Sequence, residues 1–469
     1  MAEPHPLDGP VADLVAACHA GRIDPGALLD DALARIAARN PGLNAIVGPR
    51  PDDLGAQVAA LRRRLAAGER PPLAGVPVVV KDVVWVRGQR VTQGSRLFAD
   101  FVAPRDALAV ARLRAAGALI VGMGNSSEFA CKGVTTNEVY GPTRHPLDPS
   151  LTPGGSSGGC AVAVAAGLAP LALGTDGGGS SRRPPAHVGV VGFKPSFGAI
   201  PDPDGFAHPF PGLQVIAPIA RRVDDAARMF AALAGPDPRD PDAVRLDAAP
   251  PRPARTLRIA SSPRFGLDVP VDPDVEAAFA AAVGRLRAAG WAVEQRDPTW
   301  PPGVGEDALM PLQHAGLAAL HGEAWQQDPS RFDPDIARQI ERGLQWRGTD
   351  VARAREAGVR VARTLGALLA EVDLLLCPTA PCVAWPLGRL GPASIGGRAV
   401  EPRAHAVFTP FVNHAGAAAI SLPCGGGRDG LPVGLQMIAA RGRDAQLLAA
   451  AAEAETLLAH PHAPCASSS

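Results

Sequence analysis

Two serines and one lysine are the residues of this sequence whose types and surroundings best suit chemistry. Ser180 follows three consecutive glycines, and Ser156 lies within a Gly-Gly-Ser-Ser-Gly-Gly cluster. Lys81 directly follows the apolar run Val-Pro-Val-Val-Val. A serine hydroxyl can attack an amide carbonyl once a neighbouring base takes its proton, so this set suggests acyl transfer.

Amide hydrolysis makes demands that this set can meet. An amide is a poor electrophile with a poor leaving group. Its hydrolysis therefore needs a strong nucleophile, a proton for the departing nitrogen and stabilisation of an oxyanion. Lysine can act as the base where burial keeps it neutral, because desolvation lowers a lysine pKa by up to about 3–5 units. The apolar run before Lys81 predicts such a buried position.

The glycine-rich run makes Ser180 the better nucleophile candidate. Gly177, Gly178 and Gly179 precede it, and glycine backbones can turn their N–H groups towards one point without a Cβ in the way. We expect these three N–H groups to form an oxyanion hole, and no metal ligand set is predicted.

Each feature also has a structural explanation when taken alone. Lys81 could pair with Asp82 at a strand end, and a Gly-Gly-Gly-Ser run is typical of an ordinary loop. The presence of the lysine and of both serine clusters favours the catalytic interpretation.

A rival interpretation uses the cluster around Ser156, which matches the G-x-S-x-G nucleophile elbow of another hydrolase class. It needs a downstream acid and a histidine, for which His405 or His414 could serve. It leaves the lysine and the glycine-rich run unexplained. His187 could be proposed as a base for Ser180, although a structural histidine is favoured there. The two interpretations predict different essential serines, Ser156 alone or Ser180.

The elements that would position these residues alternate between strand and helix, which is typical of an α/β fold. A short continuous apolar run predicts a buried strand directly before Lys81. The predicted helices cover 24–40, 56–67, 106–116, 159–167 and 274–289, and the predicted strands cover 76–80, 118–121, 170–174, 257–260, a segment from 292, and 372–378.

The chain is predicted to form a single domain over 1–469. Its core is expected over about 25–245 and 371–455, with a mostly helical excursion over about 250–370. The stretches 149–175 and 404–427 contain no Asp, Glu, Lys or Arg and are broken by Gly and Pro. They are therefore expected in the deep interior rather than in a membrane, and the cluster around Ser156 lies in one of them.

Composition argues against some partners. The 469 residues include 46 Lys and Arg against 46 Asp and Glu, so no net charge favours nucleic acid or an anionic membrane. The seven cysteines show no CxxC pair and are expected as free thiols. The N-terminus has no basic region followed by an apolar one, so a cytoplasmic location is expected. The expected partner is a small molecule, with a homodimer left open.

Longer segments carry a resemblance to a known family. With Lys81, Ser156 and Ser180 they resemble the amidase signature family over nearly the whole chain, with 250–370 only loosely matched. The matching segments are 40–45, 75–82, 125–129, 141–144, 152–159, 189–195, 235–240, 420–423 and 431–436.

The resemblance implies a fold and a mechanism. The fold is one α/β/α domain around a large mixed central sheet covered by helices, without a metal or organic cofactor. The catalytic set is Lys81, Ser156 and Ser180, in which Ser156 follows a cis peptide bond and relays protons between the other two. The implied supporting residues are Ser157, Asp176 and Arg182, with an ion pair between the last two bracing the nucleophile loop.

This sequence also departs from the family pattern. Gly177 stands where threonine is usual, Ser181 replaces an aliphatic residue, and the segment 183–187, Arg-Pro-Pro-Ala-His, is unusual after the nucleophile. These changes leave the mechanism in place and the substrate open.

The expected activity is hydrolysis of apolar or aryl amides through an acyl-serine intermediate. The alternatives are a carbamate or ester hydrolase, a non-catalytic binding subunit, or a glutamine amidotransferase-type subunit. The amidotransferase role is disfavoured because the segment 405–408 lacks the acidic residue that would hold the glutamine amine. The predicted substrate pocket consists of Phe129, Ala130, Cys131, Phe206, Phe210 and Phe408.

Overall fold

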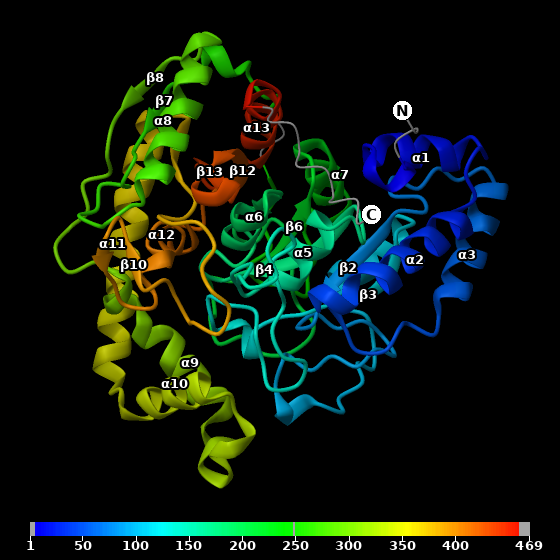
Figure 1. The fold of residues 1–469 in the computed structure, drawn as a ribbon, viewed down its shortest axis with the longest axis horizontal. Helices are drawn as coiled ribbons and strands as arrows, with labels where there is room; N and C mark the ends of the chain where they lie inside the picture. Colours follow the sequence, from blue (N-terminus) through cyan, green and yellow to red (C-terminus); the bar gives the residue numbers. More distant parts are fainter. Residues whose placement is uncertain (1–4, 247–248, 459–469) are drawn as a thin grey trace.

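A mixed sheet of eleven strands extends through the computed structural model, which describes residues 5–246 and 249–458 (Figure 1). Strands β2, β3 and β4 pair in parallel, as do β7, β8 and β9, whereas the strands between these two groups pair antiparallel. In spatial order the strands are β1 (Ile46–Val47), β3 (Leu119–Gly124), β2 (Pro77–Lys81), β4 (Leu171–Asp176), β6 (Val215–Ala220), β5 (Val191–Lys194), β12 (Ala418–Gly426), β13 (Pro432–Ala439), β9 (Leu374–Pro378), β7 (Ile259–Ser261) and β8 (Val293–Gln295).

Helices pack on this sheet, and the arrangement is the single α/β/α domain predicted from the sequence (Figure 1). A separate two-stranded ribbon is formed by β10 (Ser394–Ile395) and β11 (Arg398–Ala399). The helices are α1 (Val11–His19), α2 (Pro25–Leu43), α3 (Leu54–Ala66), α4 (Leu108–Ala115), α5 (Gly158–Ala165), α6 (Arg183–Val188), α7 (Val223–Leu233), α8 (Pro273–Ala288), α9 (Glu306–Gln327), α10 (Pro334–Gln345), α11 (Gly348–Glu371), α12 (Pro410–His414) and α13 (Asp444–Leu458).

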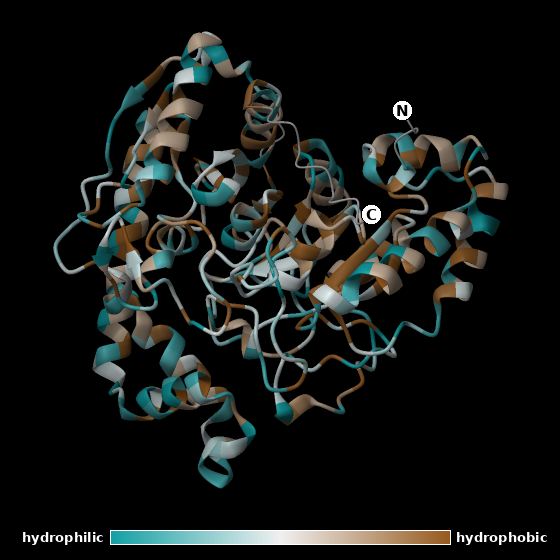
Figure 2. Ribbon diagram, in the orientation of Figure 1, coloured by the Kyte–Doolittle hydropathy of each residue, from teal (hydrophilic) through white to brown (hydrophobic). Residues whose placement is uncertain are grey.

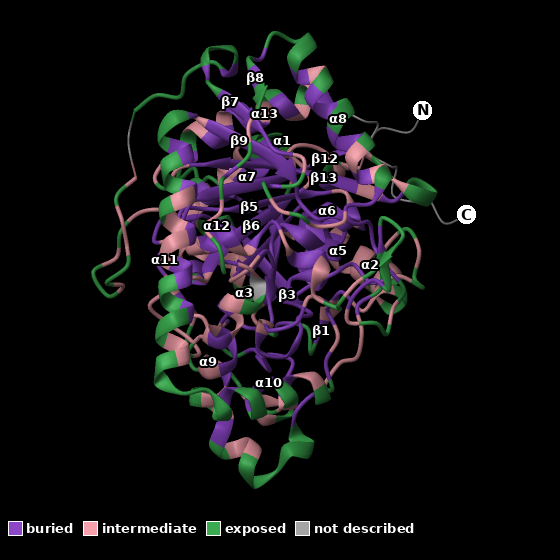
Figure 3. Cartoon of the chain, turned by 90° about the vertical axis from the view of Figure 1, so that its left-hand side faces the viewer, coloured by how far each residue is buried: buried purple, intermediate pink, exposed green. Residues whose placement is uncertain are grey.

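The sequence explains these elements locally. Every residue of β2 is buried, as expected for a parallel strand covered on both faces. Helix α2 begins with Asp24 as its cap, whose carboxylate accepts a hydrogen bond from the Gly26 N–H at 2.7 Å, and Pro25 takes the first turn. Hydrophobic residues gather on the strands (Figure 2), and the sheet forms the buried centre (Figure 3).

Two boundary predictions were wrong. Helix α2 does not end at Asn40 but continues through Pro41 to Leu43, because the left-handed Asn44 caps it instead. The predicted excursion also starts too early: β7 pairs with β9 and β8 pairs with β7 at one end of the sheet, so these two strands belong to the core. Within the described part of 250–370, α9, α10 and the first part of α11 form a lobe that extends away from the sheet, at the lower left of Figure 1.

Two further findings concern membrane spans and the cysteines. Within the described residues, every helix is too short or too polar to cross a bilayer. The six cysteines in that part of the chain are buried free thiols, and Cys465 lies outside the described residues.

Candidate active site

The lysine lies at the end of one of two neighbouring parallel strands. Lys81 is the last residue of β2, and Thr175 lies near the end of β4, which pairs with β2 in parallel. The carboxyl ends of parallel strands meet at one edge of a sheet, where α/β folds commonly place their sites. Lys81 Nζ lies 2.7 Å from Ser156 Oγ and 2.9 Å from Thr175 Oγ1, and donates to both.

Burial changes the acid–base chemistry of this lysine. Lys81 is wholly buried, and desolvation lowers its pKa from 10.5 to about 7. It does not pair with Asp82, whose carboxylate accepts a hydrogen bond from the Thr92 N–H at 2.9 Å. Burial also raises the pKa of Asp82 to about 7. A lysine with a pKa near neutrality can accept a proton from a hydroxyl at physiological pH.

Ser156 lies in the loop before α5, and hydrogen bonds hold this loop against the segment that contains Ser180. The Gly155–Ser156 peptide bond is cis, and both Ser156 and Ser157 are fully buried. The Ser157 N–H donates to the Ser180 carbonyl at 3.3 Å, and the Ser157 hydroxyl donates to the Thr175 carbonyl at 3.1 Å. These contacts hold the loop of Ser156 against the loop of Ser180, and the side chains of Ser156 and Ser180 line one cavity.

The glycine loop presents fewer free donors than the sequence predicts. The Gly179 N–H donates to the Asp176 carboxylate at 2.7 Å, which makes it unavailable to a substrate. Among the described residues, the N–H groups of Gly177 and Gly178 have no hydrogen-bond acceptor. Both glycines line the cavity together with Ser180. Of the three glycine donors that the sequence predicts, those of Gly177 and Gly178 therefore remain available.

Asp176 and Arg182 brace this loop from behind. They form a wholly buried ion pair at 2.9 Å, and the guanidinium holds the pKa of Asp176 well below its ordinary value despite burial. Arg182 also donates to the side chains of Asn413 at 2.6 Å and Gln436 at 2.7 Å. A fully paired buried charge network of this kind fixes local geometry. Arg182 makes no contact with the cavity, so the structure gives it no direct role in substrate binding.

Asn413, Gln436 and Thr409 are site residues that the sequence reasoning did not identify. The Thr409 hydroxyl donates to the Gly178 carbonyl at 2.7 Å. Two signals could have found them: Thr409 and Asn413 lie in the uncharged stretch 404–427, and Gln436 ends the family-like segment 431–436. A buried polar side chain needs a partner, and Asp176, Arg182 and the Gly178 carbonyl supply it here.

The stability of the protein is expected to depend on glycine at position 179, because the structure leaves no room for a side chain there. Its φ is +117°, and a Cβ would lie 2.1 Å from Thr409 Oγ1. We expect Gly179→Ala to lower the free energy of unfolding by about 2 kcal/mol or more. Gly178→Ala is the matched control, because its Cβ would meet nothing nearer than 4.0 Å. Urea denaturation of both variants measures this. Equal free energies of unfolding would contradict the prediction that a Cβ at position 179 strains the loop.

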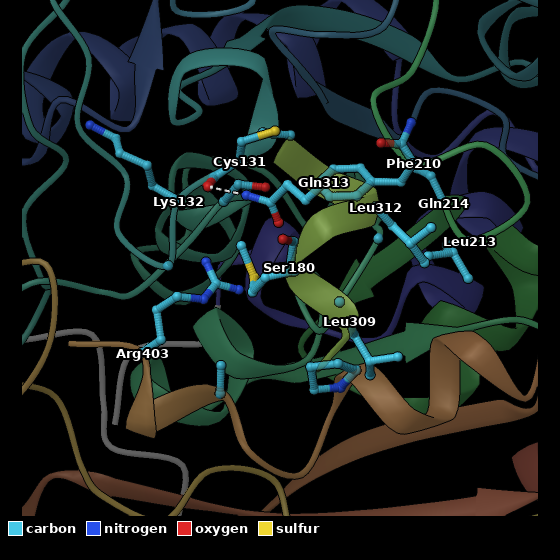
Figure 4. A pocket seen from close by; sticks show the side chains of 18 of the residues that line it. Cys131, Lys132, Ser180, Phe210, Leu213, Gln214, Leu309, Leu312, Gln313 and Arg403 are labelled. Atoms are coloured by element: carbon cyan, nitrogen blue, oxygen red, sulfur yellow. Dashed lines mark hydrogen bonds between the residues drawn. The ribbon is translucent and has the colours of Figure 1, made fainter. Parts of the chain in front are cut away.

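The cavity at this site measures about 730 Å³, including the part open to solvent. In the view of Figure 4, Ser180 lies between Arg403 on one side and Phe210 and Leu213 on the other. Beyond Ser156, Thr175, Gly177, Gly178 and Ser180, the described lining residues are Ala130, Cys131, Lys132, Gly133, Arg183, Phe210, Leu213, Gln214, Leu309, Met310, Leu312, Gln313, Arg403, His405, Ala406, Pro410 and His414.

Three of the six predicted pocket residues line the cavity, namely Ala130, Cys131 and Phe210. The other three pack elsewhere. Phe129 stacks on His321 with ring centroids 4.0 Å apart.

The remaining two belong to other aromatic contacts. Phe206 packs edge-on to Trp85 at 5.5 Å, and Phe408 is wholly buried against Phe265 at 6.3 Å. Their apolar character is explained by core packing. The apolar lining that was not predicted includes Leu213 and, from the start of α9, Leu309, Met310 and Leu312, which no motif marks.

The histidines do not support the elbow interpretation. Burial lowers the pKa of His405 well below its ordinary value and lowers the pKa of His414 to about 4. The Ser156 hydroxyl has Lys81 as its partner. His187 lies edge-on to Trp385 at 5.4 Å, and burial lowers its pKa to about 3. Within the described ranges, no group of three or more His, Cys, Asp or Glu side chains is arranged to hold a metal.

Comparison with known proteins identifies the family of this chain. The family model for amidases matches residues 27–448. The chain is 38% identical to a subunit of the glutamyl-tRNA(Gln) amidotransferase of Deinococcus radiodurans, covering 95% of this chain and 96% of that one. It is 34% identical to an acylamidase of Rhodococcus erythropolis, covering 95% and 94% respectively.

A solved structure matches over the same extent. A bacterial aryl acylamidase of the amidase signature enzymes superposes with a TM-score of 0.89 at 29% identity, covering 96% of each chain. This chain therefore belongs to the amidase family and is an amidase-signature enzyme.

Proposed function

We propose that the protein hydrolyses carbon–nitrogen bonds of small amides through an acyl intermediate on Ser180. Neutral Lys81 acts as the base, Ser156 passes the proton, and the N–H groups of Gly177 and Gly178 bind the oxyanion. The observation that carries the proposal is a wholly buried lysine with a pKa of about 7, 2.7 Å from Ser156 Oγ, beside a cavity that Ser180 lines.

In the proposed mechanism, each bond that forms is matched by one that breaks, and one proton moves between Ser180, Ser156 and Lys81. Lys81 takes the proton of the Ser156 hydroxyl as Ser156 takes that of Ser180, and the Ser180 oxygen bonds to the amide carbon. The intermediate collapses as the carbon–nitrogen bond breaks, and the Lys81 proton returns through Ser156 to the departing amine. A water molecule then attacks the ester carbon by the same proton route, releasing the carboxylic acid and restoring Ser180.

The cavity lining supports an apolar or aryl body for the substrate. Phe210, Leu213, Leu309, Met310 and Leu312 contribute apolar side chains. Burial of apolar surface contributes about 25 cal/mol per Å² to binding. The similarity to an acylamidase and to an aryl acylamidase supports amides as the preferred group. Carbamates and esters present the same carbonyl to Ser180 and are the alternatives.

A glutamine-dependent amidotransferase subunit is the second candidate, favoured by the 38% identity to a protein of that name. Its amine-binding acid is missing from the segment 405–408. Among the described residues, no Asp or Glu lines the cavity. Hydrolysis of an apolar anilide at a rate well above that of glutamine would favour the amidase.

The pH dependence tests the proposed base. Because burial lowers the pKa of Lys81 to about 7, the lysine is neutral above that pH and protonated below it. We expect kcat/KM for a para-nitroanilide to rise about tenfold per pH unit below pH 7 and to level off above it. Steady-state rates from about pH 5 to about pH 9 measure this. A profile that falls as pH rises through 7 would exclude neutral Lys81 as the base.

A further inference from the structure

Gln313 is a polar residue of the cavity wall whose side chain is mostly buried. It lies on α9, is 8% exposed, and lines the cavity together with Ser180. In Figure 4 a dashed line joins its amide nitrogen to the Cys131 carbonyl, and its amide oxygen points towards Ser180. A buried amide offers two N–H donors and one oxygen acceptor, and the partner of each decides what this residue can bind.

Both N–H groups of this amide are occupied by the protein. Gln313 Nε2 donates to the Cys131 carbonyl at 3.1 Å and to Gln339 Oε1 at 2.5 Å. A backbone carbonyl can only accept a hydrogen bond, so the nitrogen of Gln313, and not its oxygen, must face Cys131. The amide therefore has no donor left for a ligand.

The hydrogen bonds of Gln339 agree with this orientation. Gln339 lies on α10, and its Nε2 donates to Asp335 Oδ2 at 3.1 Å, because a carboxylate oxygen accepts. With its nitrogen facing Asp335, Gln339 turns its oxygen towards Gln313 and accepts there. Gln339 itself does not line the cavity. Two acceptors, the Cys131 carbonyl and the Gln339 oxygen, thus hold the nitrogen end of Gln313 in place.

The oxygen end of Gln313 is left for a ligand. Among the residues that the structure describes, no donor forms a hydrogen bond to Gln313 Oε1. An amide oxygen in this state attracts an N–H or O–H group and repels the lone pairs of another oxygen. A ligand that covers such an acceptor without supplying a donor leaves it unsatisfied, which weakens binding. The cavity that Gln313 shares with Ser180 therefore favours a substrate with a donor at this place.

We infer that Gln313 Oε1 accepts a hydrogen bond from the N–H of the scissile amide, so that Gln313 selects amides bearing an N–H over esters and tertiary amides. The inference rests on the proposed function and narrows its substrate class. Ser180 attacks the carbonyl carbon to which that nitrogen is bonded, so an acceptor that points towards Ser180 can meet the N–H. Holding the N–H also fixes the direction of the nitrogen lone pair, which takes up the proton returned through Ser156 as the carbon–nitrogen bond breaks.

Two chromogenic substrates isolate the contribution of the N–H. These are the para-nitroanilide and the para-nitrophenyl ester of butyric acid, which differ only in having an N–H or an oxygen next to the scissile carbonyl. Both give the same acyl intermediate on Ser180, and kcat/KM reports the steps up to its formation. Because esters are intrinsically more reactive than amides, the readout is the ratio of the anilide kcat/KM to the ester kcat/KM, compared between each variant and the wild-type protein.

The variant Gln313→Met keeps the length of the side chain and removes the acceptor. We expect it to lower the ratio by about tenfold, the upper range of one hydrogen bond between neutral groups. Gln339→Met is the matched control, because it removes an equally buried amide from the same network while the Cys131 carbonyl still holds the nitrogen of Gln313. Disturbance of the network slows both substrates alike, so we expect the control to keep the ratio within about threefold of the wild-type value.

The fate of the ratio in the two variants decides the inference. A fall of about tenfold in Gln313→Met, but not in Gln339→Met, supports an N–H bound by Gln313, and continued ester cleavage shows that the variant folds. An unchanged ratio in Gln313→Met, loss of all activity in that variant, or an equal fall in both variants overturns it. If the wild-type protein cleaves the anilide through Ser180 while the ratio ignores Gln313, the inference fails and the amidase proposal stands. If neither substrate acylates Ser180 in the wild-type protein, the amidase proposal itself fails.

Discussion

Replacing Ser180 with alanine is expected to lower the rate of amide hydrolysis by about 10⁴-fold or more, because the acyl intermediate can no longer form. Ser181→Ala is the matched control. Ser181 is adjacent and also buried, but its hydroxyl donates to the Asp176 carboxylate at 2.9 Å rather than facing the cavity. We expect the control to lose less than about tenfold, the scale of one hydrogen bond in the bracing network.

Steady-state assays on one anilide measure both variants, and circular dichroism shows whether each one folds. If Ser180→Ala is as active as the wild-type protein, Ser180 is not the nucleophile. In that case Ser156, the serine of the elbow interpretation, would be the next candidate.

Replacing Lys81 with methionine is expected to lower kcat by about 10³-fold, the contribution of a positioned general base. Methionine keeps the length of the side chain in a fully buried position, so the main change is loss of the amine 2.7 Å from Ser156 Oγ. The pH dependence expected below pH 7 should vanish in the residual activity, because the group with a pKa of about 7 is gone.

A second buried lysine provides the control for this variant. Burial lowers the pKa of Lys194 to about 7 as well, but its ammonium donates to the Pro195 carbonyl at 2.9 Å and lines no part of the cavity. Lys194→Met removes an equally buried amine without touching the serines. If Lys194→Met and Lys81→Met reduce kcat equally, the loss reflects folding and not the removal of a base.

The sequence predicts the fold where local patterns report burial directly. The continuous apolar run before Lys81 identifies β2, and Asp24 with Pro25 identifies the start of α2. The place of β7 and β8 in the sheet was not predictable in this way, because each strand is only three residues long and the pairing of β7 with β9 joins segments distant in sequence. Pro41 predicts a helix end, although the left-handed Asn44 decides that end.

The candidate site was predictable in part for the same reason. Ser156 and Ser180 stand out by their glycine neighbours, which tight loops require. The lining of the cavity was not predictable from such signals. Phe408 and Phe210 look alike in sequence, yet one is buried in the core and the other lines the cavity. Arg403 lines the same cavity as Ser180 although it comes from a loop with no motif, and only the tertiary fold brings the two residues to one cavity (Figure 4).

The occupation of the Gly179 N–H by Asp176 was likewise invisible in the sequence. Three consecutive glycines indicate that the backbone can turn sharply, but they do not indicate which group their N–H groups face. The carboxylate of Asp176 accepts from the N–H groups of both Gly179 and Ser181, and this decides which donors remain for an oxyanion.

The central claim is that Ser180 is the nucleophile and that Lys81 activates it. The most direct test treats the purified protein with a fluorophosphonate probe and maps the adduct by peptide mass spectrometry, which needs no knowledge of the substrate. We predict a single adduct on Ser180 in the wild-type protein and none in Lys81→Met, with labelling retained in Lys194→Met. An adduct on Ser156 in place of Ser180, or no adduct on either serine, would contradict the account.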